Sequence, residues 1–227
     1  MSLLKKLFGG ETELRSSMDQ QYWDDRAKKF GKYGVINLSY GKNEFDKVTQ
    51  RDEDEIFPVV RPLLTGKEKM ALDFGCGPGR FTRDLAGLIS GKSIGVDSTK
   101  AFIKQAPRSK DTEYRLIENG RIPLPDSSVD LVWTFNVLGC IKDELLPQTV
   151  AEIERVLVHG GIVVATENST EKENVACYTY RQPADYIRLF KKVRLKHVRD
   201  FLDKGQGFEE RLSIIAGKKT ENGSDAS

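Results

Sequence analysis

The first part of the chain shows the spacing of helices. Tyr22, Arg26 and Phe30 lie four residues apart, which predicts a helix over residues 18–30. A glycine-containing loop follows, and a second helix is expected over residues 52–64, where two prolines should bend or shorten it. These elements are expected to form a lid that precedes the core.

From residue 69 onward, short apolar runs alternate with stretches of helical spacing. The runs that predict strands are residues 70–74, 93–97, 112–117, 129–134 and 162–166. Between the last two runs, Leu146, Val150, Ile153 and Leu157 step by four, three and four, which predicts a helix packed on a sheet. Gly160 and Gly161 are expected to end this helix as a glycine C-cap. Strands separated by helices indicate right-handed crossovers and a parallel sheet that is covered on both faces.

The last part of the chain predicts a hairpin. Residues 193–200 and 208–217 are two strand-like runs, and Asp203–Gly207 between them is read as a turn. The prediction is therefore an α/β sandwich of three layers, with a mostly parallel seven-stranded sheet and an antiparallel C-terminal hairpin. We divide the chain into a helical lid (1–45), a core (46–217) and a small, polar tail (218–227) that we expect to be disordered.

Composition restricts the function classes. The chain has 227 residues, a net charge of +2 and 31% charged residues, so that neither nucleic acid nor an anionic membrane is required as a partner. Three separated cysteines and two histidines make a metal site unexpected. No apolar run approaches the roughly 20 residues that span a bilayer. We expect a cytoplasmic protein with free thiols; the oligomeric state does not follow from the sequence.

The strongest chemical signal is the loop Gly75-Cys76-Gly-Pro-Gly79 after the first core strand. Its three glycines, Gly75, Gly77 and Gly79, permit positive φ and close approach of a ligand to the backbone. Arg80 stands where the dinucleotide fingerprint requires its third glycine. Asp73, just before the glycines, would repel a pyrophosphate but accept a hydrogen bond from a cationic amino group. The loop therefore favours a cofactor that carries an amino acid over NAD.

This loop resembles the first motif of the class I S-adenosylmethionine (SAM)-dependent methyltransferases, in which an acidic residue precedes G-x-G-x-G. The resemblance covers roughly residues 69–167 and implies a Rossmann-like fold with SAM as cofactor. It implies that Asp97, with Ser98 beside it, binds the ribose hydroxyls. The adenine would lie against Asn119, Gly120 and Arg121, where Asn119 replaces the usual Asp, and Phe135 and Asn136 would pack beneath the methyl donor.

The N-terminal helix carries a second resemblance. Tyr22-Trp23-Asp-Asp-Arg26-Ala27 is similar to the Y-W-D-x-R-A lead-in of small bacterial methyltransferases, many of them linked to sugar or glycan modification. The resemblance implies that Tyr22 and Trp23 fold over the cofactor and that Arg26 pairs with its carboxylate. Docking of the helix on the core is an alternative role, and the two are compatible.

The acceptor site is less well marked. Glu167, at the end of the fifth strand, is the candidate general base, and a solvated loop residue is the alternative. Tyr178, Tyr180 and Arg181 are candidate substrate residues. The basic run at residues 191–199 either steers a phosphate or is a solvated edge that discourages strand pairing. The Asn-Pro-Pro-Tyr tetrad of amino-purine methylases does not occur, which argues against methylation of DNA bases.

The sequence thus predicts methyl transfer from SAM to an oxygen or nitrogen of a small molecule. A sugar or glycan precursor, phosphorylated or carried on a nucleotide, is the acceptor that the N-terminal motif suggests. Two alternatives stay open. One is an NAD-dependent oxidoreductase, which Arg80 and Asp73 disfavour. The other is a catalytically silent binding subunit that holds the cofactor or a partner protein.

Overall fold

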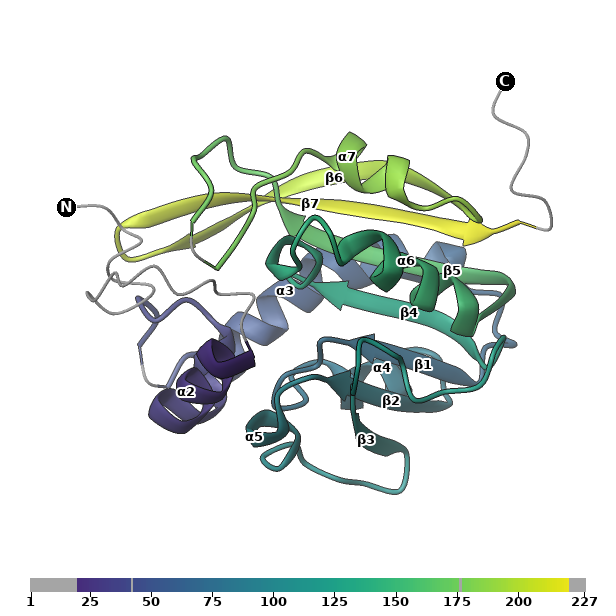
Figure 1. Ribbon diagram of the computed structural model, residues 1–227, viewed down its shortest axis with the longest axis horizontal. Coiled ribbons are helices and arrows are strands. Elements are labelled where there is room, and N and C mark those ends of the chain that lie inside the picture. Colours follow the sequence, from purple (N-terminus) through teal and green to yellow (C-terminus); the bar gives the residue numbers. More distant parts are fainter. Residues whose placement is uncertain (1–19, 42, 176, 221–227) are drawn as a thin grey trace.

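The computed structural model describes residues 20–41, 43–175 and 177–220. A single sheet runs through the molecule in the order β3-β2-β1-β4-β5-β7-β6 (Figure 1). Its strands are β1 Met70–Phe74, β2 Lys92–Asp97, β3 Thr112–Leu116, β4 Val129–Phe135, β5 Leu157–Asn168, β6 Val193–Gly205 and β7 Phe208–Lys219. The first five are parallel, and β7 pairs antiparallel with both β5 and β6. The predicted fold class is confirmed.

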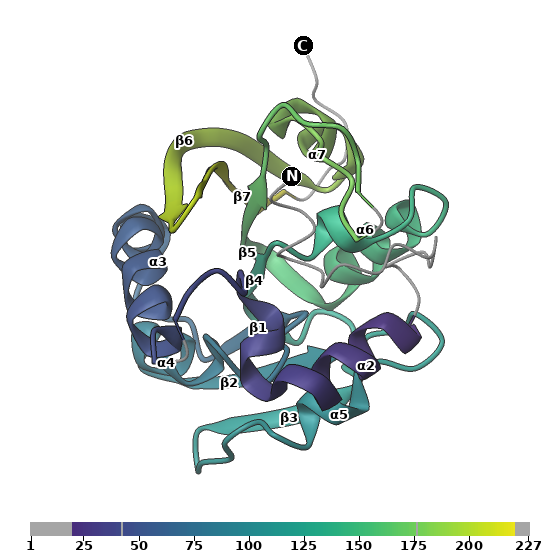
Figure 2. The same ribbon diagram turned by 90° about the vertical axis from the view of Figure 1, so that its left-hand side faces the viewer.

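Helices cover both faces of the sheet (Figure 2). On one face lie α3 Phe45–Val60 and α4 Thr82–Leu88, and on the other α6 Leu146–Val156 and α7 Pro183–Leu189. Each pair encloses an apolar core, because the strands alternate their side chains between the two faces. Trp133 of β4 belongs to the core under α3 and α4, and Val132 to the opposite one. The N-terminal helix α2, Gln20–Phe30, contacts the short helix α5, Lys100–Ile103.

The second predicted helix is longer than the pattern indicated. It begins at Phe45 rather than at residue 52 and continues past Pro58 to Val60, where a 3-10 turn at Arg61–Leu63 follows. Pro58 lies inside the helix with its ring exposed, and the buried face of the helix supplies Val48, Ile56 and Val60. The first predicted helix is observed as α2, and residues 18 and 19 lie outside the described part.

The glycine C-cap predicted after α6 is wrong. The helix ends at Val156, and Leu157 already has extended backbone and pairs with Val129 of β4. The pairing then shifts register and resumes at Leu131 and Ile162, so that residues 158–161 form a bulge inside β5. Gly160, with φ of 72°, lies in this bulge.

The C-terminal turn is tighter than predicted. Gly205 pairs with Phe208, so only Gln206 and Gly207 remain unpaired, and Gly207 has φ of 78°. Asp203 therefore lies within β6 instead of in the turn. The predicted tail also begins later, because β7 extends to Lys219.

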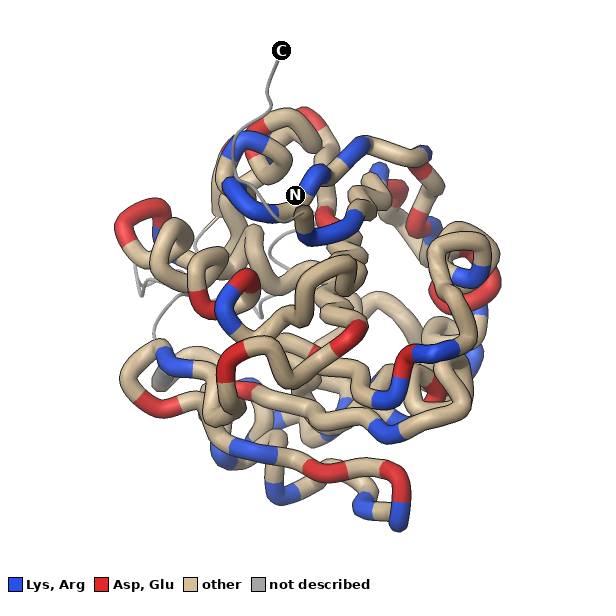
Figure 3. Tube along the Cα trace, turned by 90° about the vertical axis from the view of Figure 1, so that its right-hand side faces the viewer, with Lys and Arg blue, Asp and Glu red and all other residues tan. Residues whose placement is uncertain are grey.

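Charged residues of both signs are interspersed on the side of the molecule shown in Figure 3. The basic run is exposed on β6, the edge strand, where Arg199 pairs with Glu55 of α3. Among the described residues, no helix is both long and apolar enough to span a bilayer, and no group of side chains suited to a metal ion occurs within the same residues.

Replacing Gly217 by Ala should destabilise the hairpin, because the added Cβ would collide with the Arg194 carbonyl of the paired strand. We expect the free energy of unfolding, measured by urea titration, to fall by about 1–3 kcal/mol. Gly87→Ala is the matched control: no atom lies within 4 Å of its added Cβ, and helix propensity favours Ala by up to about 1 kcal/mol. Equal stabilities of the two variants would contradict the packing described here.

Candidate functional site

The glycine loop connects β1 to α4 at the carboxyl end of the sheet. Gly75, Gly77 and Gly79 have φ of 73°, 54° and 82°, which is the left-handed region predicted for them. The N–H groups of Gly75 and Cys76 both donate to the Val96 carbonyl, at 2.8 and 3.0 Å. The loop is therefore fixed to the end of β2.

Asp97, at the end of β2, holds the loop from its other side. Its carboxylate accepts the Gly77 N–H at 2.8 Å through Oδ2 and the Thr99 N–H at 2.7 Å through Oδ1. Burial raises the pKa of this carboxyl group, against the opposing effect of these two hydrogen bonds. A carboxylate oxygen can accept more than one hydrogen bond. Asp97 thus remains able to bind ribose hydroxyls, and the exposed Ser98 follows it.

Asp73 lies inside the domain rather than at its surface. The residue is 2% exposed, and the Thr82 hydroxyl donates to its Oδ2 at 2.6 Å. Burial raises the pKa of its carboxyl group to about 7. The predicted contact of Asp73 with a cationic amino group stays a prediction.

The lid segment that follows α2 packs directly on the glycine loop. A Cβ on Gly77 would lie 2.8 Å from Cγ1 of Val35. Arg26 holds this segment, because its Nε donates to the Gly34 carbonyl at 2.6 Å and its Nη2 to the Ile36 carbonyl at 3.4 Å. The Tyr22 hydroxyl accepts from Nη1 of Arg26 at 3.4 Å. Arg26 therefore positions the lid, and its predicted pairing with a cofactor carboxylate stays a prediction.

A cavity of about 130 Å³ lies between the lid, the end of the glycine loop, the carboxyl end of β4 and the base of the hairpin. Six of the predicted site residues line it: Trp23, Arg26, Phe135, Asn136, Tyr178 and Tyr180. The remaining predicted residues do not. Asn119, Gly120 and Arg121 form an exposed turn after β3, with φ of 52° at Asn119 and 70° at Gly120.

Glu167 is neither solvated nor directed at the cavity. It is 0% exposed and accepts the backbone N–H groups of Val137, Leu138 and Gly139 at 3.2, 2.9 and 3.0 Å. The Tyr178 hydroxyl donates to its Oε2 at 2.7 Å. Burial is the largest influence on the carboxyl group and raises its pKa. The solvated-loop interpretation is wrong, and as a general base Glu167 would have to give up these hydrogen bonds.

Two of the candidate substrate residues likewise stabilise the loop after β4. Arg181 donates to the carbonyls of Leu138 and Ile141, each at 3.2 Å, and pairs with Asp143. It is buried and does not line the cavity. Tyr178 and Tyr180 both line the cavity. Tyr178 also has a structural role, because its hydroxyl bonds Glu167.

A chain of charged side chains, absent from the predicted site, connects α3 with the glycine loop and the hairpin. Arg80, which follows Gly79, pairs with Asp52 of α3, and its Nε donates to Thr49 Oγ1 at 2.9 Å. Arg51 bonds Asp52 at 3.1 Å and also pairs with Asp203 of β6. The Tyr40 hydroxyl donates to the same Oδ1 of Asp203. Tyr40, Asp52, Arg80 and Asp203 all line the cavity, as do Asn168 and Glu210.

Comparison with known proteins shows similarity to methyltransferases. Residues 72–165 match the family model described as a methyltransferase domain. A phosphoethanolamine N-methyltransferase of Triticum aestivum is 26% identical over 96% of this chain and 43% of its own length. Among solved structures, a phosphoethanolamine N-methyltransferase of Haemonchus contortus, in complex with phosphoethanolamine and S-adenosylhomocysteine, has a TM-score of 0.65 at 16% identity over 94% of this chain and 51% of that one. The YcgJ protein of Bacillus subtilis has a TM-score of 0.61 at 14% identity over 74% of this chain and 100% of that one.

The fold is that of the class I methyltransferases. The chain spans less than half the length of the curated relatives that it matches first. The match to a methyltransferase domain and the S-adenosylhomocysteine in the Haemonchus contortus neighbour support SAM as the cofactor, and the chemistry of the site fits SAM. The glycine loop offers close backbone approach, and Asp97 offers a carboxylate beside it. In volume, at about 130 Å³, the cavity falls below the roughly 300–1,000 Å³ that is usual for ligand sites.

Glu167→Gln should loosen the loop after β4. An amide NH₂ would face backbone N–H groups that now donate to a carboxylate, which costs about 1–3 kcal/mol in the free energy of unfolding. Glu171→Gln, with a side chain that is 84% exposed, is the control and should leave stability unchanged. If both variants unfold at the same urea concentration as the unmodified chain, the structural role of Glu167 is wrong.

Proposed function

We propose that the chain transfers the methyl group of SAM to an amine nitrogen of a small molecule. The observation that carries this proposal is the composition of the cavity beside the glycine loop. Besides Arg26, and Arg80 in its pair with Asp52, the wall contains the carboxylates Asp203 and Glu210 and the aromatic rings of Trp23, Tyr40, Phe135, Tyr178 and Tyr180. Carboxylates and aromatic faces both attract a cationic amine.

The glycine loop and Asp97 are the proposed cofactor residues. The loop would approach the amino-acid end of SAM, and Asp97 would accept hydrogen bonds from the two ribose hydroxyls. Asn119, Gly120 and Arg121 would border the adenine. When bound, SAM supplies an electrophilic methyl carbon on a sulfonium. Since the cavity is small, the lid segment around Val35 would have to move away from Gly77 to admit the nucleoside.

Asp203 is the proposed partner of the acceptor amine. Both of its hydrogen bonds, from Tyr40 and Arg51, go to Oδ1, so that Oδ2 is available to a ligand. An amine enters as an ammonium ion and becomes a nucleophile when it loses a proton, which Asp203 would accept. Burial raises the pKa of this carboxyl group, which favours that transfer. The nitrogen lone pair then bonds the methyl carbon as the carbon–sulfur bond breaks, and S-adenosylhomocysteine leaves.

The lining favours an amine over the sugar hydroxyl that the N-terminal motif suggests. The carboxylates and aromatic rings attract an ammonium ion more strongly than a neutral hydroxyl. Glu167, the base that the sequence suggested, is buried and occupied by hydrogen bonds. The relatives named as phosphoethanolamine N-methyltransferases act on an amine, in agreement with this choice. Methyl transfer depends mainly on the alignment of the nucleophile with the methyl group. The transfer therefore requires few functional groups from the protein.

Asp97→Asn tests the cofactor assignment. Calorimetric titration with S-adenosylhomocysteine should show binding to the unmodified chain and about tenfold to hundredfold weaker binding to the variant, because charge-assisted hydrogen bonds are lost. NAD, titrated alongside, should not bind. Binding of NAD, or an unaltered affinity of the variant, would overturn the assignment.

Asp203→Asn tests the acceptor assignment. With small primary amines and labelled SAM, kcat/KM should fall by at least about tenfold, because the variant has no carboxylate to take the ammonium proton. Asp200→Asn is the matched control on the same strand, since Asp200 bonds His197 and Ser213 instead of lining the cavity. Titration with S-adenosylhomocysteine confirms that both variants are folded. Methylation of hydroxyl compounds in preference to amines would contradict the proposal.

A further inference from the structure

We propose that Glu53 of α3 and Asp84 of α4 share one proton, and that this proton makes the attachment of the glycine loop to α3 sensitive to pH. Both carboxyl groups lie in the wall of a pocket of about 460 Å³ between α3 and α4, which lie side by side in Figure 2. This pocket has no lining residue in common with the cavity.

Glu53 is buried without a donor for one of its oxygens. The residue is 6% exposed, and its Oε1 has no hydrogen-bond partner among the described residues. A buried carboxylate that lacks donors is costly, whereas protonation removes the charge and turns one of the oxygens into a donor. The burial of Glu53 therefore favours its neutral form.

Asp84 is the acceptor for this proton. The side chains of Glu53 and Asp84 are hydrogen-bonded, and two carboxyl groups can bond each other only when one of them is protonated. Glu53 holds the proton because it is the more buried of the two. The side chain of Asp84 is 37% exposed and lies 3.6 Å from Nε of Arg83, so its charge is in contact with water and with a cation.

The charges around Glu53 come from α3, α4 and the end of the glycine loop. Asp84 and Asp54 disfavour the charged form of Glu53, Arg80 favours it, and Arg61 lines the same pocket. Burial has the largest effect, and in sum the pKa of the Glu53 carboxyl is raised to about 8. The proton is therefore retained at neutral pH and lost in mildly alkaline solution.

The proton on Glu53 keeps Arg80 with Asp52. Arg80 bonds Thr49 through Nε and pairs with Asp52, the residue before Glu53. A neutral Glu53 does not compete for this guanidinium, but an ionised Glu53 would attract it away from Asp52 and would repel Asp84 in the first turn of α4. Because Arg80 and α4 follow directly on the glycine loop, both effects act on the loop.

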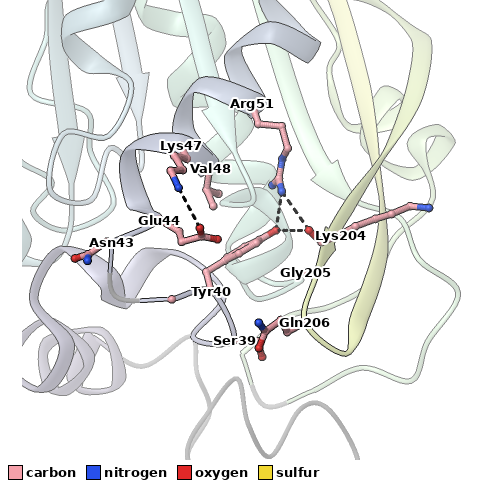
Figure 4. A pocket seen from close by; sticks show the side chains of 11 residues that line it. Ser39, Tyr40, Asn43, Glu44, Lys47, Val48, Arg51, Lys204, Gly205 and Gln206 are labelled. Carbon is pink, nitrogen blue, oxygen red and sulfur yellow. Dashed lines mark hydrogen bonds and ion pairs between the residues drawn. The ribbon is translucent and has the colours of Figure 1, made fainter.

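The contacts of α3 with the hairpin do not depend on Glu53. Figure 4 shows Arg51 directed from α3 at Tyr40 and Lys204, where it bonds the Tyr40 hydroxyl at 3.0 Å and the Lys204 carbonyl at 3.3 Å. These bonds persist when Glu53 ionises. The change with pH is therefore confined to the side of α3 that faces α4 and the glycine loop.

Carbon-13 nuclear magnetic resonance of the full chain, labelled at the glutamate carboxyl carbons, tests the shared proton. One signal should titrate with a midpoint near 8 and should be missing from Glu53→Gln. In Asp84→Asn its midpoint should fall by about one pH unit, because the like charge is removed. The control Glu144→Gln, at an exposed glutamate before α6, should leave the signal unchanged.

The link to the glycine loop is tested on the same chains. The Arg80 Nε–H signal and the amides of Gly77 and Gly79 should shift with the midpoint of Glu53 in the unmodified chain but not in Glu53→Gln. The Kd for S-adenosylhomocysteine at pH 9.0, divided by that at pH 6.5, should be about threefold larger for the unmodified chain than for Glu53→Gln. The comparison with the variant cancels the titration of the ligand and of other groups.

If Glu53→Gln loses no signal that titrates above pH 7, the shared proton is overturned. If the Arg80 signal and the ratio of Kd values respond to pH equally in both chains, the link to the glycine loop is overturned. Neither measurement involves a methyl acceptor, so both outcomes are independent of the proposed transfer to an amine.

Discussion

The buried contact between Arg80 and Asp52 is the interaction on which the rest of the site depends. Their side chains are 6% and 2% exposed, so neither charge has access to enough water to stand alone. Breaking such a pair leaves an uncompensated buried charge, which is strongly destabilising. Since Asp52 also bonds Arg51, and Arg51 bonds Asp203, the pair fixes α3 between the glycine loop and the hairpin. This network of ion pairs therefore fixes the distance between the proposed cofactor site and the proposed acceptor site.

A second buried carboxylate has the same effect on the opposite wall. Glu167 gathers three consecutive backbone N–H groups after β4 and the Tyr178 hydroxyl from a segment eleven residues further on. The loop after β4 thereby has a defined shape without any regular element of more than three residues. Two buried carboxylates thus hold two walls of the cavity, and the segment around Val35 lines a third side.

The sequence predicted the elements that its local pattern encodes and missed those created by long-range packing. Alternating apolar runs were sufficient for the sheet and its hairpin, and the glycine spacing for the loop after β1. Asp52 and Asp203 gave no signal, because they are 151 positions apart and are linked only in the folded chain, through Arg51, which bonds both. Glu167 was noticed for its place at a strand end, but burial and its donors, which decide its role, depend on the folded chain. Gly160 and Gly161 are typical of a helix C-cap, but the helix ends earlier, because Leu157 already pairs with Val129 of β4.

The contact of Val35 with Gly77 makes the closed lid a competitor of the cofactor. If the cofactor binds beside Gly77 as proposed, residues 34–36 would have to leave the loop, and the apparent dissociation constant would be the intrinsic one divided by the open fraction. The hydrogen bonds of Arg26 to the Gly34 and Ile36 carbonyls stabilise the closed position of this segment. The affinity for the cofactor would then depend on the fraction of chains with an open lid as well as on the contacts made after binding. A change that weakens the closed position of the lid would lower the apparent dissociation constant.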